Sequence, residues 1–409
     1  MTSENPKLRP VNVQMIQHQN QPMLLLDDPL HLSEAAIAVP QALATLLLLM
    51  DGTRNLAGLE AGLQVRAGIR LQPGVLAQLL EALDTAYLLD NDRFRRARAA
   101  TIEAYRSAPF RPQTVDGIAF ETSPEVAAEE LQALVDTLPP PATAAEEDGA
   151  SIRGVVSPHI DYQRGGSVYA EVWRAAADAA RRAELAVVFG TDHRGSEAAL
   201  TLTRQSYGTP FGVLPTDQDL VDALAGVLGD EAAFGEELNH REEHSIELAA
   251  IWLHFVRRGE AVPVLPVLCG SFGAFVAGQG EPAAHEPFAQ VAHVLQSVMA
   301  RRRTLVVAAA DLAHVGPAFG DAHGVDFIGR AQQRNADERL LASICAGDAE
   351  AFFAQIRDEG DRRHICGLPP IYLTLRVLGE AQGRPAGYAL CPADPQGLSF
   401  VSVAGALLH

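Results

Sequence analysis

The sequence is short of basic residues and has no long apolar run. Its 32 lysines and arginines face 51 acidic residues, which gives a formal net charge of −19. This balance argues against electrostatic binding to nucleic acid or to an anionic membrane. The longest apolar run, residues 43–50, is far shorter than the ~20 residues that span a bilayer. The polar start MTSENPKLRP lacks the apolar segment of a secretory signal. We expect a cytoplasmic protein with no nucleic-acid and no membrane partner.

Several common site signatures are also missing. The four cysteines form no CxxC and no disulfide-like spacing (Cys269, Cys345, Cys366 and Cys391), so we predict free thiols in a reducing compartment. There is no Walker A sequence and no G-x-S-x-G elbow. GQGEPA, residues 278–283, follows no strand-to-helix turn and so does not predict a dinucleotide site.

The first hundred residues predict a small, mainly helical domain. PQALATLLLLMDG reads as a short buried helix, and TRNLAGLEAGLQ as a second one with Thr53 as candidate N-cap. QPGVLAQLLEALDTAYLL predicts a third helix, with Pro73 near its start. DNDRFRRAR follows as a hairpin or wing. We therefore predict a winged-helix-like domain over 1–107. Residues 24–95 resemble the small PqqD-like peptide-binding domains, and a plain helical appendage is the alternative.

The remainder predicts an α/β domain over 109–409. SPEVAAEELQALVDTL is an amphipathic helix with Ser123 as cap and Pro124 at its first position, between the linkers SAPFRPQ and LPPPATAAEEDGA. From residue 151, apolar strand-like runs alternate with helical segments. These runs are GVVSPH, LAVVFGTDHRG, VPVLPVLCG, TLVVAAADLAHVG and a closing GLSFVSVAGALL. We expect the first helix of this part from about 167 to 180. Such alternation is typical of a mostly parallel sheet flanked by helices.

Three of the predicted strands end in histidines or acids. The residues concerned are His159, the pair Asp192 and His193, and the pair Asp311 and His314. A fourth histidine, His244, stands in EEHSIE where a helix begins. The carboxyl ends of parallel strands meet at one edge of a sheet, so we expect these side chains to converge. Imidazole is the commonest metal ligand. Two histidines with a carboxylate suit Fe(II), and three histidines with water suit Zn²⁺. For each residue alone, loop capping is the competing interpretation.

Four ordered segments at these positions resemble the signature loops of the MEMO family. They are SPHIDYQRGGSVYA, FGTDHRG, EEHSIELAAIWLHF and AAADLAHVG, and HICGLPPIYLTL resembles the later Cys-Gly segment of that family. The bacterial branch is called AmmeMemoRadiSam system protein B. The resemblance covers about residues 109–409. It implies a fold similar to that of class III extradiol dioxygenases, with the metal site at strand ends.

The resemblance also implies roles for single residues and for partners. It gives metal-ligand roles to His159 and His193, and an acid/base role to His244. The metal expected is Fe(II), with Zn or Cu as alternatives. Radical-SAM and AMMECR-type proteins are the partners expected, with a small molecule or a peptide as ligand. Catalysis is one interpretation, and a non-catalytic scaffold that binds a peptide or protein in the same cleft is the other.

The sequence departs from the family pattern at three places. Animal members have a cysteine where Ala313 stands, which predicts that a thiolate ligand is not available. AAADLAHVG contains no glutamate, so Asp311 or His314 would have to act as third ligand. The usual SPHAGY is SPHIDY here, and we expect Asp161, Tyr162 and Asp192 to line the same pocket.

One motif suggests a different class of enzyme. Residues 240–244 read H-x-x-E-H, the inverted zinc-protease signature. That signature needs one continuous helix, and Asn239 and Ser245 favour a helix start within it. We therefore give the peptidase interpretation little weight.

Overall fold

The structure is a computed structural model that describes residues 5–114, 123–140 and 152–409. The chain divides into two compact units, Met1–Ser107 and Ala108–His409. Most of the predicted linker LPPPATAAEEDGA lies outside the described residues. Within the described ranges, no helix combines the length and apolarity that crossing a membrane requires. All four cysteines are free thiols, as predicted.

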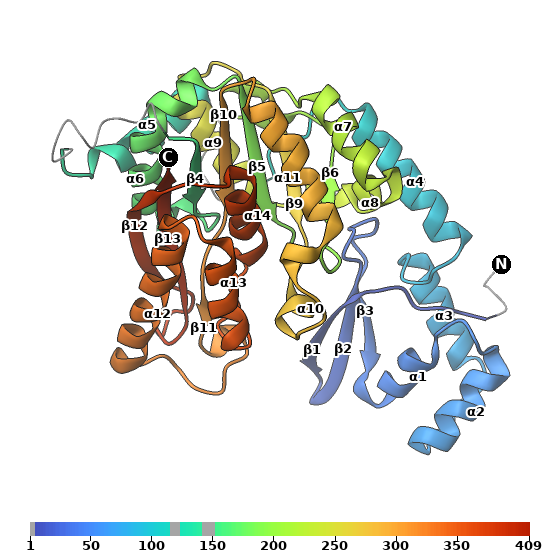
Figure 1. The fold of residues 1–409 in the computed structure, drawn as a ribbon. Helices are drawn as coiled ribbons and strands as arrows, with labels where there is room; N and C mark the ends of the chain where they lie inside the picture. The colour runs from blue at the N-terminus through green and yellow to red at the C-terminus, as the bar shows by residue number, and fades with distance from the viewer. Residues whose placement is uncertain (1–4, 115–122, 141–151) are drawn as a thin grey trace. The chain divides into compact units, whose positions relative to one another are not determined.

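The first unit begins with a sheet that the sequence did not lead us to expect. Strands β1 (Asn12–His18), β2 (Gln21–Asp27) and β3 (Ile37–Pro40) form an antiparallel sheet. The two-residue turn between β1 and β2 has positive φ at Gln19 and Asn20, as type I′ hairpins require. Helices α1 (Ala44–Leu49), α2 (Leu56–Ala67), α3 (Val75–Thr85) and α4 (Asp92–Ser107) follow (Figure 1). The leucines of α1, α2 and α3 form one core with those of β2. The PqqD-like resemblance stays a prediction.

Two local expectations for this unit are wrong. DNDRFRRAR forms the start of helix α4 and no hairpin, with the Asn91 side chain accepting the N–H of Phe94 as a cap. Arg95 of this segment pairs with Asp90 and Asp92 at the helix start, where acidic residues favour helix formation. Helix α2 is capped by Asn55, whose side chain accepts the N–H of Gly58, and Thr53 instead bonds to Asp51.

The second unit contains the predicted mostly parallel sheet flanked by helices. Its eight strands run in the order β11-β13-β4-β10-β5-β9-β6, with β12 paired to β13. Strands β4 (Gly154–Ser157), β10 (Thr304–Ala309), β5 (Leu185–Thr191) and β9 (Val264–Cys269) are parallel neighbours in the centre. The antiparallel strands are β6 (Leu200–Leu202), β11 (His314–Val315), β12 (Gly383–Pro392) and β13 (Phe400–Leu408).

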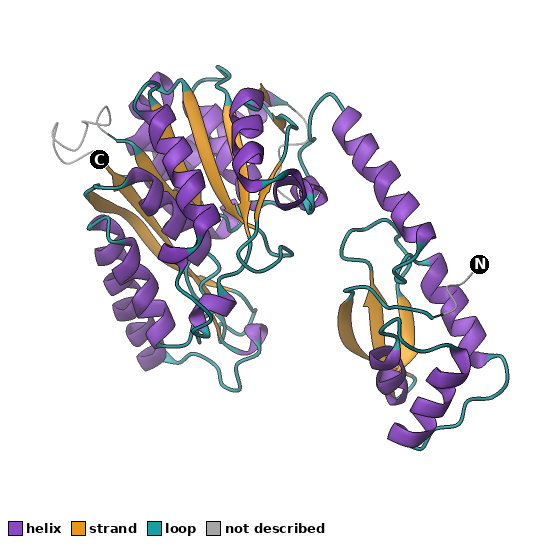
Figure 2. Ribbon diagram, turned by 45° about the vertical axis from the view of Figure 1, so that its right-hand side comes forward, coloured by secondary structure: helices purple, strands orange, loops and turns teal. Residues whose placement is uncertain are grey.

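Helices cover both faces of this sheet (Figure 2). Val187 and Phe189 of β5 belong to one core, and Ala186 and Val188 to the other, because successive strand side chains point to opposite faces. The second core includes α6 (Tyr162–Arg182) and α9 (Ser245–Val256). The first includes α7 (Gln218–Leu228), α11 (Glu286–Met299), α12 (Phe327–Cys345), α13 (Ala349–Asp358) and α14 (Leu368–Leu378). Strands buried on both faces explain the continuous apolar runs in the sequence.

The smaller elements of this unit complete the layers. The predicted helix after the first linker is α5 (Pro124–Asp136), and its Ser123 cap is confirmed. Helix α6 begins at Tyr162, several residues before the expected start, so its glycines are helical rather than part of a loop. A Cβ at Gly165 would lie 2.5 Å from Ile160, so close packing requires glycine there. The remaining elements are β7 (Tyr207–Thr209), β8 (Gly212–Leu214), α8 (Asp230–Phe234), α10 (Gly273–Val276) and the 3₁₀ turns η1 (Gln41–Leu43), η4 (Glu237–Arg241), η5 (Pro282–Ala284) and η6 (Pro317–Phe319).

Candidate metal centre

The ends of β4 and β5 and the start of α9 bring three histidines together. His159 follows β4, His193 follows β5, and His244 is the N-cap residue of α9. The ring centroids of His159 and His193 are 5.2 Å apart, and those of His193 and His244 are 5.1 Å apart. His159 and His244 are 5.6 Å apart. This grouping is the convergence expected from strands whose carboxyl ends share one edge.

His159 is held as a neutral imidazole with one nitrogen facing the site. Its Nδ1 lies 3.0 Å from the carbonyl oxygen of Ala309, so the Nδ1–H donates to that oxygen. The tautomer leaves the Nε2 lone pair available to a ligand. Burial, and then the charge of His193, lower the pKa of His159 to about 3. His159 is therefore unprotonated at neutral pH, as metal binding requires.

A cysteine offers a third possible donor atom beside His159 and His193. The Cys366 Sγ lies 3.3 Å from the His159 Nε2, and donor atoms of His159, His193 and Cys366 all lie within 4.8 Å of one another. Although Ala313 offers no sulfur, a thiol therefore does lie beside the histidines, and it comes from the loop before α14. Gly367 N–H donates to the Asp311 carbonyl at 3.0 Å, and a Cβ on Gly367 would lie 2.2 Å from that oxygen. The close approach explains the glycine that follows Cys366.

Glu243 orients two of the histidines, a role that the sequence did not suggest. Its Oε2 lies 3.0 Å from the His193 Nδ1 and 3.1 Å from the His193 backbone nitrogen, and its Oε1 lies 3.2 Å from the His244 Nδ1. Burial opposes ionisation of Glu243, but its hydrogen bond and charge interaction with His193 dominate and lower its pKa. Burial also disfavours the charged form of His193. The hydrogen bond and the charge of Glu243 outweigh burial and raise the pKa of His193. Burial, and then His159, lower the pKa of His244 to about 4.

Two donor sets share His193, and ring geometry distinguishes them. One is His159, His193 and Cys366; the other is His193, Glu243 and His244. The His193 and His244 rings are stacked at 12°, so their in-plane lone pairs lie in nearly parallel planes and do not converge. The His159 and His193 rings stand at 85°, which lets two lone pairs meet at one point. The set with Cys366 is the better candidate for a metal, and Glu243 fits the carboxylate that accepts the second N–H of a histidine ligand.

Comparisons with known proteins identify the family of this chain. The family model described as Memo-like protein matches residues 111–405. The chain belongs to this family. Among relatives, a MEMO1 family protein of Aquifex aeolicus is 25% identical over 93% of this chain and 95% of its own length. A MEMO1 family protein of Thermus thermophilus is 26% identical over 83% of this chain and 95% of its own length. The family resemblance read from the four loops is confirmed.

The two other ligand candidates of this Memo-family chain lie next to the donor set but outside it. Asp311 is buried, and its Oδ1 accepts the N–H of His159 at 2.9 Å and that of Ile160 at 3.3 Å. Its Oδ2 is 3.8 Å from the His159 Nε2. Burial raises the pKa of Asp311. His314 begins β11, and its Nδ1 is buried with no hydrogen-bond partner among the described residues. Asp311 thus positions the backbone of the His159 loop.

The three predicted pocket residues differ in their surroundings. Asp161 caps α6 and pairs with Arg164. Tyr162 donates its hydroxyl proton to the Leu248 carbonyl at 2.7 Å, in the core between α6 and α9. Asp192 accepts hydrogen bonds from Asn239 and from the backbone of Arg194. Among the three, only Asp192 lines the cavity beside the histidines.

The H-x-x-E-H segment is not a single helix. His240 lies in the 3₁₀ turn η4, whereas His244 caps α9. His240 is buried, with its Nδ1 2.8 Å from the Tyr207 hydroxyl and its Nε2 2.9 Å from the Thr201 carbonyl. Both ring nitrogens are thus engaged away from His244, which leaves the peptidase interpretation without a metal site.

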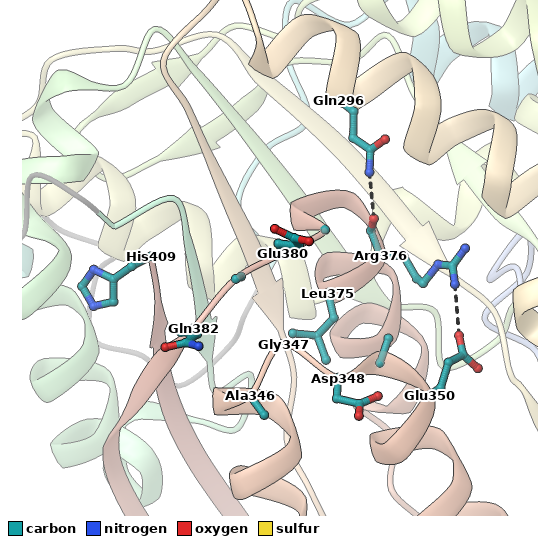
Figure 3. Close-up of a pocket in the computed structure, with 13 residues that line it drawn as sticks. Gln296, Ala346, Gly347, Asp348, Glu350, Leu375, Arg376, Glu380, Gln382 and His409 are labelled. Carbon is teal, nitrogen blue, oxygen red and sulfur yellow. Dashed lines mark hydrogen bonds and ion pairs between the residues drawn. The ribbon is translucent and has the colours of Figure 1, made fainter.

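A cavity of about 260 Å³ opens beside the donor set. His193 and Cys366 form part of its wall, together with Asp192, Asp361 and His364. A larger cavity, of about 950 Å³, includes His409, which follows β13. Leu408 of β13 pairs with Gly154 at the start of β4, so this cavity lies at the opposite end of the strands. Figure 3 shows its side chains, among which Arg376 pairs with Glu350. It contains none of the predicted site residues.

Proposed function

We propose that this protein binds one transition-metal ion through His159, His193 and Cys366, and that the centre acts on a small molecule. The observation that carries the proposal is the convergence of two mutually perpendicular imidazoles and a thiol at one edge of the sheet. Three protein donors leave coordination positions open, as catalytic centres do. A metal site at these strand ends is also what the resemblance to class III extradiol dioxygenases implies.

The donor set supports particular metals. Thiolate with imidazole suits Zn²⁺ and copper, whereas carboxylate and imidazole suit Fe(II). The Fe(II) expectation depended on a carboxylate ligand, and Asp311 is engaged with the backbone of His159 and Ile160. We therefore propose zinc or copper as the resident metal ahead of iron.

The residues around the donor set support proton transfer. A bound metal would supply Lewis-acid polarisation of an oxygen atom of the ligand. His244 carries a lowered pKa of about 4 and a half-exposed side chain, so it is a neutral base at neutral pH. Glu243 holds the Nδ1 side of both His193 and His244. We assign to His244 the acceptance of a substrate proton at its Nε2, with Glu243 stabilising the imidazolium that forms.

Metal analysis of purified protein tests this function. Wild type is expected to hold about one equivalent per chain, and His159→Ala/His193→Ala and Cys366→Ser each to hold less than about one fifth of that. His293→Ala removes an exposed histidine on α11 and is the matched control, expected to keep full content. Equal metal content in all variants would refute the ligand set.

The partners form a separate proposal, based on the family resemblance. We infer that the protein acts in the cytoplasm with radical-SAM and AMMECR-type proteins, and that the ligand is a small molecule or a peptide side chain. Affinity purification of the tagged full chain from its native host tests this. Recovery of neither protein class under cross-linking would contradict it.

A further inference from the structure

The 260 Å³ cavity has the size and lining of a small-ligand site. It lies beside His193 and Cys366, and Phe272, Ile365 and Leu368 supply apolar walls. Small-molecule sites are typically of roughly 300–1,000 Å³, so this one matches a single ring with a short substituent. Its contact with two of the three donor residues means that such a ligand would reach the metal position.

Apart from the histidines, the charged side chains that line this cavity are all acidic. Asp192 and Asp361 line it, and no lysine or arginine is among its lining residues within the described part of the chain. Arg363, two residues from Asp361, is directed to other acids: it pairs with Asp337 at 2.6 Å and Glu359 at 2.7 Å. Away from the metal position, a carboxylate tail would therefore meet two acidic side chains and no lysine or arginine, which is unfavourable in a partly buried site.

Asp361 is placed to act on a ligand at the metal position. Its Oδ1 accepts the N–H of Ile365 at 2.9 Å, which fixes the carboxylate in the loop that carries Cys366. Asp361 lines the same cavity as Cys366 and His193, so its carboxylate borders the space that a ligand would fill. This placement lets the Asp361 carboxylate pair with an ammonium group of a ligand.

We propose that this cavity is the ligand site of the metal centre and that it selects small ring compounds with an amine tail over those with a carboxylate or phosphate. The selection comes from Asp361, aided by Asp192. This inference rests on the proposed metal-binding function, because the probes that test it reach the site through the metal.

Three probes with the same chelating pair of hydroxyls and different tails test the proposal: dopamine, 4-methylcatechol and 3,4-dihydroxyphenylacetate. They are titrated calorimetrically into the zinc-loaded full chain, because Zn²⁺ does not change oxidation state. Dopamine is expected to bind at least about tenfold more tightly than the acid, with the neutral compound between them. Equal affinities, tighter binding of the acid, or no binding of any probe to zinc-loaded protein would overturn the proposal.

Asp361→Asn is the matched variant. Asp361 has a φ of 44°, a left-handed conformation that asparagine also adopts readily, and an asparagine Oδ1 can still accept from Ile365. In this variant, the ratio of the affinities for dopamine and 3,4-dihydroxyphenylacetate is expected to fall to about twofold or less, with zinc content and folding unchanged. A gap that persists in the variant would overturn the role of Asp361. Failure of the wild type to bind zinc would refute the proposed function itself, whereas bound zinc with no charge preference would refute only this inference.

Discussion

Arg111 offers the clearest stability test. It is a fully buried charge in SAPFRPQ, the segment predicted to be a linker. Its side chain is 0% exposed and pairs with Glu247 of α9, also 0% exposed. Its Nε donates to the His240 carbonyl at 2.6 Å and its Nη2 to the Glu243 carbonyl at 2.9 Å. Arg111 thus ties down the loop that carries Glu243 and His244.

Arg111→Met would leave the Glu247 carboxylate buried without its cation. Removing one partner of a buried pair costs about 3–5 kcal/mol. At about 2 °C per kcal/mol for a large domain, the melting temperature of the second unit should fall by about 6–10 °C. Glu247 keeps its hydrogen bond from the Thr114 N–H at 2.9 Å, so the fall in melting temperature should lie near the lower end, about 6 °C. Metal affinity should fall as well, because Glu243 orients His193.

The double variant Arg111→Met/Glu247→Leu provides the control. Replacing a buried pair by apolar residues is often close to neutral, so the double variant should recover at least about half of the loss. Both tryptophans of the chain, Trp173 and Trp252, lie in the second unit, so tryptophan fluorescence during heating reports that unit alone. A shift below about 2 °C for the single variant, or a double variant less stable than the single, would refute the reasoning.

Three further predictions concern the metal centre. Cys366→Ser should abolish the sulfur-to-metal charge-transfer absorption of cobalt-loaded protein, and an unchanged spectrum would exclude the thiolate ligand. Burial, followed by Asp311, raises the pKa of the Cys366 thiol, so a metal must displace the thiol proton. Metal affinity should therefore rise by up to about tenfold per pH unit between neutral and alkaline pH. Metal titrations at a series of pH values that show no such rise would contradict this. Asp161→Ala should cost about 1 kcal/mol as the lost cap of α6, measured by urea unfolding, with metal content unchanged; loss of metal would instead make Asp161 a ligand.

The sequence predicted which strand ends form the site better than it predicted the role of each residue there. Apolar runs ending in polar residues indicated β4, β5 and β10 with their loops. His159 and His193, after β4 and β5, do converge, whereas His314, after β10, lies outside the donor set. The wing was wrong because DNDRFRRAR satisfies its charges locally as a helix start. The β1–β2 hairpin was missed because β1 has no buried side chain to mark an alternating pattern, and its turn, Gln19-Asn20, lacks the glycine typical of a type I′ turn. Asp161, expected to line the pocket, caps helix α6, a role that suits an aspartate at a helix start.

By itself, the sequence determined the α/β class and the meeting of His159, His193 and His244, because strand periodicity and a shared sheet edge are local consequences of the pattern. Only the tertiary structure decided the rest. Cys366 reaches His159 across 207 residues of chain, Glu243 reaches His193 across 50, and Arg111 reaches Glu247 across 136. No local pattern records such pairings, since each depends on how separately formed loops pack at the end of the sheet.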